Sequence, residues 1–290
     1  MKFKFLNTVF ASSILLLSTA SQAGLLTLEF TNTLDNMLAD VRSNFAPQGL
    51  GYDASTNELL FLQQSSQTIF NTDLSGIIQS SSPLNYNHTT SIAADANNYY
   101  FSDYTANSGG LDVFSQNKST GVITAISSDK AAYGGYPIDV RNGVLYRTNN
   151  SSTYSWSGLN EILISSVTNA DAGIQRVSLA TSIGIGDIAI DSGRNQVWTI
   201  DYTANAMLRQ FDLATGAELS SHALGFDGLS AGLTFANDKL YYYDHNSGSG
   251  STLSAYSLQS NSQEVPEPST LAIFALGMIG LASRRFKKQS

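Results

Sequence analysis

Short apolar strands alternate with polar turns five times along the middle of the chain. Each unit begins with an apolar strand and continues through a polar turn into a strand rich in aromatic and branched residues. The first strands start at Gly49, Ser91, Pro137, Asp187 and Gly232, at separations of 42, 46, 50 and 45 residues. Strands of this length with turns at this spacing predict an all-β chain.

The later strands of each unit follow the same order. Second strands are expected over residues 59–62, 99–101, 144–146, 197–200 and 240–243, and third strands over 68–70, 112–114, 209–211 and 254–256. In several units a Ser-Gly or Thr-Gly turn then precedes a fourth short strand. The third unit is the longest, and its extra residues 149–172, which are mostly polar, predict an insertion on one rim.

A unit of about 45 residues with four strands has the size of a propeller blade. Because one such sheet cannot bury both of its faces, several must pack around an axis. The fifth unit ends near Leu258 without a fourth strand, while residues 25–29 at the start of the repeat region belong to no unit. Pairing these residues with the last unit would close the ring and remove exposed edges. We expect five blades, or six if residues 24–46 form an additional degenerate unit.

The N-terminus has the features of a secretory signal peptide. Lys2 and Lys4 precede an apolar run over residues 9–17, and small residues stand before an expected cleavage between Ala23 and Gly24. The run is too short to span a membrane. We therefore expect export and removal of residues 1–23 by signal peptidase.

The C-terminus has the features of a second targeting signal. Val265, Pro266, Glu267, Pro268, Ser269 and Thr270 are followed by an uninterrupted apolar stretch over residues 271–282, and then by Arg284, Arg285, Lys287 and Lys288. As a helix, the apolar stretch would reach about 18 Å, against a hydrocarbon core of about 30 Å. The four cations would hold the tail on the cytoplasmic side. Residues 271–282 are therefore expected to form a transient transmembrane helix in the inner membrane.

This C-terminal arrangement resembles the PEP-CTERM sorting signal that exosortase recognises in Gram-negative bacteria. The resemblance covers about 25 residues, 265–289, and matches in order, spacing and position. It implies an exosortase partner and a final location at the cell surface or outside the cell, typically in organisms that produce exopolysaccharide. The expected organisation is a signal peptide over 1–23, a β-propeller over 24–262 and a sorting signal over 263–290.

The repeat region resembles extracellular propellers of the NHL and YncE-like type. The resemblance rests on aromatic second strands such as Leu240-Tyr241-Tyr242-Tyr243-Asp244, and on Asp-x-x-x-Asn turns. Those families usually close with more than five blades.

Composition and charge exclude several classes of protein. Hydrophobic residues make up 42% of the chain, too many for a disordered chain, and the absence of cysteine excludes disulfide, iron–sulfur and thiolate zinc sites. Without its two terminal signals the chain keeps nine cationic and 22 acidic residues, a net charge near −13. Such a domain is expected to bind no nucleic acid, and instead to hold cations or meet neutral polysaccharide.

Candidate binding residues lie after the second strands. Asp103-Tyr-Thr-Ala-Asn107 recurs as Asp201-Tyr-Thr-Ala-Asn205, with Asp244 and Asn246 in register. Oxygens from such loops could bind Ca²⁺ or hydrogen-bond sugar hydroxyls on one rim, although Asp and Asn are also ordinary turn residues. Trp156, in the long third unit, is a candidate surface for stacking against a sugar.

No catalytic constellation stands out. We expect His88, His222 and His245 to lie at opposite ends of the blades, so that they do not form one metal site. The sequence favours a non-catalytic binding or matrix component of the envelope or exopolysaccharide. A propeller enzyme, such as a metal-dependent lyase or lactonase, and a scaffold for another surface protein are the alternatives.

Overall fold

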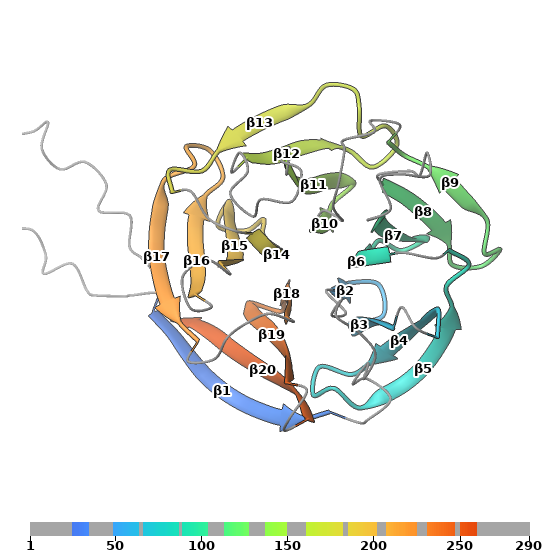
Figure 1. Ribbon diagram of the computed structural model, residues 1–290, viewed down its shortest axis with the longest axis horizontal. Coiled ribbons are helices and arrows are strands. Elements are labelled where there is room, and N and C mark those ends of the chain that lie inside the picture. Colours follow the sequence, from blue (N-terminus) through green and yellow to red (C-terminus); the bar gives the residue numbers. More distant parts are fainter. Residues whose placement is uncertain are drawn as a thin grey trace, which may run out of the picture. The chain divides into compact units, whose positions relative to one another are not determined.

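In the described part of the computed structural model, twenty β-strands form five antiparallel sheets of four strands each. The structure describes residues 25–34, 49–63, 66–86, 89–103, 113–127, 137–149, 161–181, 185–201, 207–224, 231–246 and 250–259. Each sheet is one blade, and the blades are arranged around a common axis (Figure 1). The five-blade prediction is confirmed.

The blades are numbered in chain order. Blade 1 contains β2 (Leu50–Asp53), β3 (Glu58–Gln63), β4 (Thr68–Thr72) and β5 (Ile78–Pro83). Blade 2 contains β6 (Thr89–Ala94), β7 (Asn98–Asp103), β8 (Val113–Asn117) and β9 (Ile123–Ala125). Blade 3 contains β10 (Ile138–Arg141), β11 (Val144–Asn149), β12 (Glu161–Ser166) and β13 (Gln175–Ser178). Blade 4 contains β14 (Ile185–Asp191), β15 (Gln196–Asp201), β16 (Met207–Asp212) and β17 (Glu218–Ala223).

Blade 5 is assembled from both ends of the repeat region. It contains β18 (Ala231–Ala236), β19 (Lys239–Asn246) and β20 (Gly250–Gln259), and its outer strand is β1 (Leu25–Thr33). Thr31 Oγ1 hydrogen-bonds Ser254 Oγ at 2.8 Å, and Leu34 donates its N–H to the Ser251 carbonyl at 2.9 Å. The predicted closure by residues 25–29 is confirmed, and it gives β20 a partner along an edge that would otherwise be open.

The apolar core is divided among the five interfaces between blades. Each cluster of buried side chains draws on two neighbouring blades, because each sheet has two faces and packs one against each neighbour. Trp198 of β15 is fully buried between blades 4 and 5, and Tyr242 of β19 lies in the same cluster. The aromatic second strands predicted from sequence supply much of this core.

In all five blades the first strand pairs with the second strand in the same register, so equivalent residues of the five inner strands can be compared. The residues at one level are Leu50, Ile92, Ile138, Ile188 and Leu233, each paired with the fourth residue of its second strand: Phe61, Phe101, Arg147, Thr199 and Tyr242. The start of each first strand pairs with the end of the second strand, as Ala231 does with Asp244. These two points therefore lie at the same end of a blade.

Part of the predicted insertion is wrong. Residues 161–166, within the polar stretch 149–172, form β12, with Ile162 and Leu163 buried. A third strand was not expected here because its sequence, Glu-Ile-Leu-Ile-Ser-Ser, lacks the aromatic ending of the other third strands. Residues 150–160, which include Trp156, lie outside the described residues.

Candidate functional site around the axis

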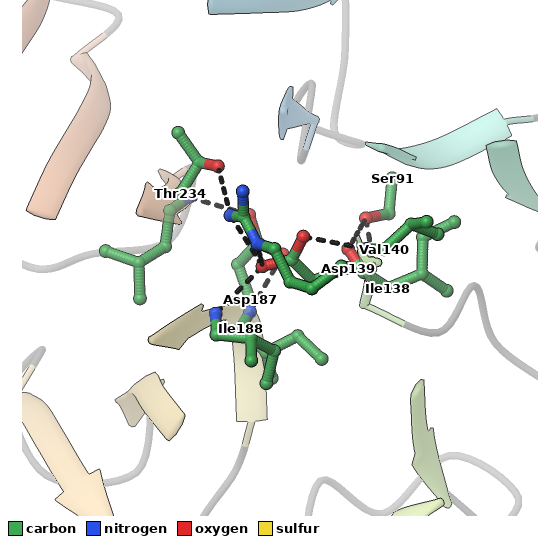
Figure 2. A network of polar contacts seen from close by, with 10 residues as sticks. Ser91, Ile138, Asp139, Val140, Asp187, Ile188 and Thr234 are labelled. Atoms are coloured by element: carbon green, nitrogen blue, oxygen red, sulfur yellow. Dashed lines mark hydrogen bonds and ion pairs between the residues drawn. The ribbon is translucent and has the colours of Figure 1, made fainter. Parts of the chain in front are cut away.

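The inner strands leave one edge free, and polar side chains bridge from these strands to the next blade. Ser91 of β6 hydrogen-bonds Ile138 of β10, with its Oγ accepting the N–H at 3.1 Å. In the same register position of blade 4, Asp187 of β14 accepts the N–H of Leu233 in β18 at 2.7 Å. Backbone donors on an edge strand need acceptors when they are buried. The two side chains therefore accept backbone hydrogen bonds from the inner strand of the next blade, and so hold successive blades together (Figure 2).

Asp139 forms a similar bridge from blade 3 to blade 4. One carboxylate oxygen accepts the N–H of Val140 at 2.7 Å, and the other accepts the N–H of Ile190 in β14 at 2.8 Å. Arg141 donates to the second oxygen through Nε and Nη2, at 3.1 and 2.9 Å. Burial raises the pKa of Asp139, although Arg141 acts in the opposite direction.

Asp187 is buried with fewer charged neighbours. Its two oxygens accept the N–H groups of Ile188 and Leu233, at 2.9 and 2.7 Å. Burial raises the pKa of Asp187 well above the usual carboxyl value, and the charge of Asp139 adds to this effect. Burial therefore favours the protonated form of Asp187 more than in an exposed carboxyl, while the two backbone hydrogen bonds act in the opposite direction.

Arg141 extends from blade 3 toward blades 5 and 1. Its Nη2 donates to Thr234 Oγ1 of β18 at 3.4 Å, and its guanidinium carbon lies 5.9 Å from the ring centre of Tyr52 in β2. The Tyr52 hydroxyl donates in turn to Asn57 and Asn237, at 3.0 and 3.2 Å. These contacts join three blades at the axis, so the polar groups at this level serve to fix the ring.

Two glycines allow the remaining inner strands to approach closely. A Cβ on Gly51 would lie 2.6 Å from the Ile92 carbonyl oxygen, and one on Gly232 would lie 2.9 Å from the Leu50 nitrogen. Contacts this short require the absence of a side chain. Blades 5, 1 and 2 are thus joined by backbone packing, whereas blades 2 to 5 are joined through Ser91, Asp139 and Asp187.

The cations of the described part of the chain are all close to carboxylates. The ion pairs are Lys118 with Asp53, Arg141 with Asp139, Arg147 with Asp171, Arg176 with Glu161, Arg194 with Asp191 and Asp238, Arg209 with Asp201 and Glu218, and Lys239 with Glu29. The acidic excess predicted from composition therefore surrounds cations that are already paired.

The predicted rim aspartates lie at or near the ends of the second strands of three blades: Asp103 and Asp201 end β7 and β15, and Asp244 is two residues before the end of β19. Asp103 pairs with Thr89, Asp201 with Ile185 and Asp244 with Ala231, so all three stand at the same end of their blades. Asp201 is buried and accepts a hydrogen bond from Arg209 Nε at 2.8 Å. Asn246 lies on β19. Asn107, Asn205 and Trp156 are outside the described residues, as are Ala23, Gly24, residues 265–270 and the basic tail 284–288.

The reasoning about the histidines needs correction. His222 lies on the outer strand β17, and His245 on β19 just beyond Asp244. In each blade the first strand starts at the end of the blade where the second strand finishes. A histidine shortly before a first strand and a histidine at the end of a second strand therefore lie at the same end of the blades, not at opposite ends. Within the described ranges no group of three His, Cys, Asp or Glu side chains is placed to hold a metal ion.

Sequence reasoning missed Asp139, Arg141 and Asp187 as a network. A signal was present, since Asp139 and Asp187 interrupt or open short apolar inner strands, where a charged side chain requires a specific partner. Which blade supplies that partner depends on the order of the blades around the axis.

Comparison with known proteins identifies the C-terminal address. Residues 264–288 match the PEP-CTERM protein-sorting motif. The motif implies export, sorting to the envelope or surface, and exosortase as the processing partner. A search of curated proteins finds no matching sequence.

Solved structures are similar in fold. Glutaminyl cyclase from Myxococcus xanthus has 12% identity and a TM-score of 0.53, over 80% of this chain and 97% of that chain. A chain of the nidogen/laminin complex has 18% identity and a TM-score of 0.46, over 68% of this chain and 71% of the other. At 12% identity, the likeness to the glutaminyl cyclase concerns the fold alone. In the described ranges no helix is long and apolar enough to cross a membrane.

Proposed function

We propose that this chain is an exported, exosortase-processed propeller that acts as a non-catalytic binding or matrix component at the cell surface, associated with exopolysaccharide or the envelope. The observation that carries the proposal is the sorting motif at residues 264–288, which follows within a few residues of the last propeller strand, β20. A rigid ring delivered by such a signal is suited to presenting a fixed surface outside the cell.

The polar groups at the axis support a binding role over a catalytic one. Ser91, Asp139 and Asp187 are engaged with backbone groups of neighbouring blades, and Arg141 is engaged with Asp139. If these side chains rearranged around a substrate, the hydrogen bonds that join neighbouring blades would break. Binding would then fall on the loops, which vary while the scaffold stays fixed.

The rim at the ends of the second strands is the proposed binding surface. Asp103 and Asp244 stand at equivalent positions of blades 2 and 5, and Asn246 follows on β19. Carboxylate and amide oxygens suit sugar hydroxyls, directly or through Ca²⁺. Trp156 would add a stacking surface. Asp201 contributes less, because its carboxylate is buried against Arg209.

Co-sedimentation tests the binding role. The exported protein is mixed with exopolysaccharide from the producing cells and pelleted, with calcium or with a chelator. Binding is expected, and its loss with chelator would identify the calcium-bridged form. The double variant Asp103→Asn, Asp244→Asn should bind more weakly. Asp238→Asn is the matched control, because Asp238 is 84% exposed in the β18–β19 turn at the opposite end of blade 5. The absence of co-sedimentation in every condition would reject this role.

A second experiment tests sorting independently of binding. Replacing Pro266, Glu267 and Pro268 by alanine should leave unprocessed protein in the inner membrane. The matched control replaces three residues of the exposed β14–β15 turn, Ser192-Gly193-Arg194, and should be exported normally. Normal export of the Pro-Glu-Pro variant would contradict recognition of this motif.

A further inference from the structure

Arg147 is a buried cation at a position where other blades place uncharged residues. It is the fourth residue of β11, and its counterparts are Phe61, Phe101, Thr199 and Tyr242. Its side chain is only 3% exposed. A fully buried guanidinium requires several hydrogen-bond acceptors, because it has five N–H donors and does not lose its charge.

The side chain lies in the interface between blades 2 and 3. Leu145, two residues earlier and so on the same face of β11, packs in one buried cluster with Tyr100 and Val113 of blade 2. Ala170 belongs to the same cluster, and its N–H donates to the Ile126 carbonyl of blade 2 at 3.1 Å.

The acceptors around Arg147 do not match its donors. Nη2 reaches the Ala170 carbonyl at 3.4 Å and Asp171 Oδ1 at 3.8 Å, and Nε is buried with no acceptor. Arg209, by contrast, donates to Asp201 and Glu218 at 2.8 Å each. The Asp171 oxygen that faces Arg147 already accepts the Ser127 hydroxyl at 2.6 Å. An orphaned buried donor on a charged group is strongly unfavourable, so the Nε–H of this guanidinium still lacks an acceptor, although Nη2 has two long contacts.

We infer that Arg147 is the anchor of a binding site for a small oxyanion between blades 2 and 3. A carboxylate or phosphate group suits the guanidinium because its oxygens can accept the Nε–H together with an Nη–H. The low exposure of Arg147 favours one small anionic group over a polymer segment. Such an anion would satisfy the Nε–H of Arg147, and would stabilise the fold without any contribution from the proposed rim. This site goes beyond the proposed function and does not depend on it.

Asp171 sets the affinity of this site. Its carboxylate forms a long ion pair with Arg147, at 3.8 Å from Nη2, and is close enough to repel an incoming anion. If Arg147 and Asp171 simply form a structural salt bridge within blade 3, removing the Asp171 charge should weaken the fold. If the site takes an oxyanion, removing that charge should strengthen anion binding.

Thermal unfolding of the exported protein at constant ionic strength tests the site. Sodium chloride is replaced stepwise by sodium acetate, sodium phosphate or sodium glucuronate, the first two supplying a free anion and the third a sugar acid, with glucose as the uncharged control. Since a ligand that binds only the native state raises its stability, the Tm should rise with oxyanion concentration and then level off. A response to acetate or phosphate would identify a free anion as sufficient. A response to glucuronate alone would identify a sugar acid.

Three variants separate the explanations. Arg147→Phe, which copies Phe101 of blade 2, should abolish the anion-dependent rise in Tm. Arg176→Met, at a 55% exposed cation of the same blade, should leave it unchanged. Asp171→Asn should shift the rise to lower anion concentration. The inference is overturned if wild type shows no oxyanion-dependent rise, or if Arg147→Phe retains it. If Arg147→Phe does not fold, the Asp171→Asn variant decides the question. The inference is then overturned if the Tm of Asp171→Asn responds to oxyanions no more strongly than the Tm of wild type.

Discussion

The turn at Gly216 gives the sharpest test of how blades 3 and 4 meet. Gly216 precedes the outer strand of blade 4 with φ of +72°, and a Cβ built there would lie 1.9 Å from the Ser178 carbonyl oxygen of blade 3. Its own carbonyl accepts the N–H of Ala180 at 2.8 Å, a hydrogen bond that also joins the two blades. Gly143 has φ of +76° but nothing within 4 Å of the corresponding Cβ.

The two glycines therefore separate backbone strain from contact between blades. Gly143→Ala should destabilise the fold by about 1–2 kcal/mol, the cost of a left-handed conformation for a residue with a Cβ. Gly216→Ala carries the same strain, adds about 1–3 kcal/mol for overpacking against backbone atoms and loses about 0.5–1.5 kcal/mol from the inter-blade hydrogen bond. The expected difference between the variants is therefore about 1.5–4.5 kcal/mol, or about 3–18 °C in Tm for a domain of this size.

Thermal unfolding followed by circular dichroism, with urea titration as a second measure, gives the comparison. Both variants should fold at low temperature and unfold cooperatively, with Gly216→Ala melting well below Gly143→Ala. Equal destabilisation of the two variants would refute the close approach of the β16–β17 turn to β13.

Two further predictions concern the axis and the closure. Asp187→Ser, which copies Ser91 of blade 2, should lower stability most at acidic pH: the native state binds the Asp187 proton more tightly than the unfolded chain, so the wild-type advantage falls as pH rises above the usual carboxyl pKa. Urea titrations of both proteins from pH 4 to 8 measure this, and an advantage that grows with pH would contradict it. Deleting β1 should expose the edge of β20 and abolish cooperative unfolding, which calorimetry detects, whereas an unchanged transition would show that β1 is dispensable.

The number of blades and their closure were predictable because each depends on local pattern. The repeated order of apolar strand, polar turn and aromatic strand places four of the five blades directly. The unclaimed residues 25–29 supply the missing strand of the fifth. The strand β12 was missed because burial between two sheets selects apolar residues in general, and Ile162 and Leu163 satisfy it without an aromatic residue.

The contacts between blades were not predictable from the same pattern. Asp187 and Leu233 are 46 residues apart, and only the geometry of the ring brings the carboxylate to the backbone N–H. The same limit applies to Arg147, whose place in the second strand suggests an ordinary core position until its acceptors are compared with its donors. Sequence locates the strands, and the packing of neighbouring blades decides which polar groups are satisfied.

Intact-mass spectrometry of the protein recovered from outside producing cells tests the central claim most directly. The account predicts a polypeptide that begins near Gly24 and has lost the apolar stretch and basic tail beyond the Pro266-Glu267-Pro268 motif, with the propeller intact. Recovery of a chain that still ends at Ser290, or retention of the whole chain inside the cell, would contradict export and exosortase processing of this propeller.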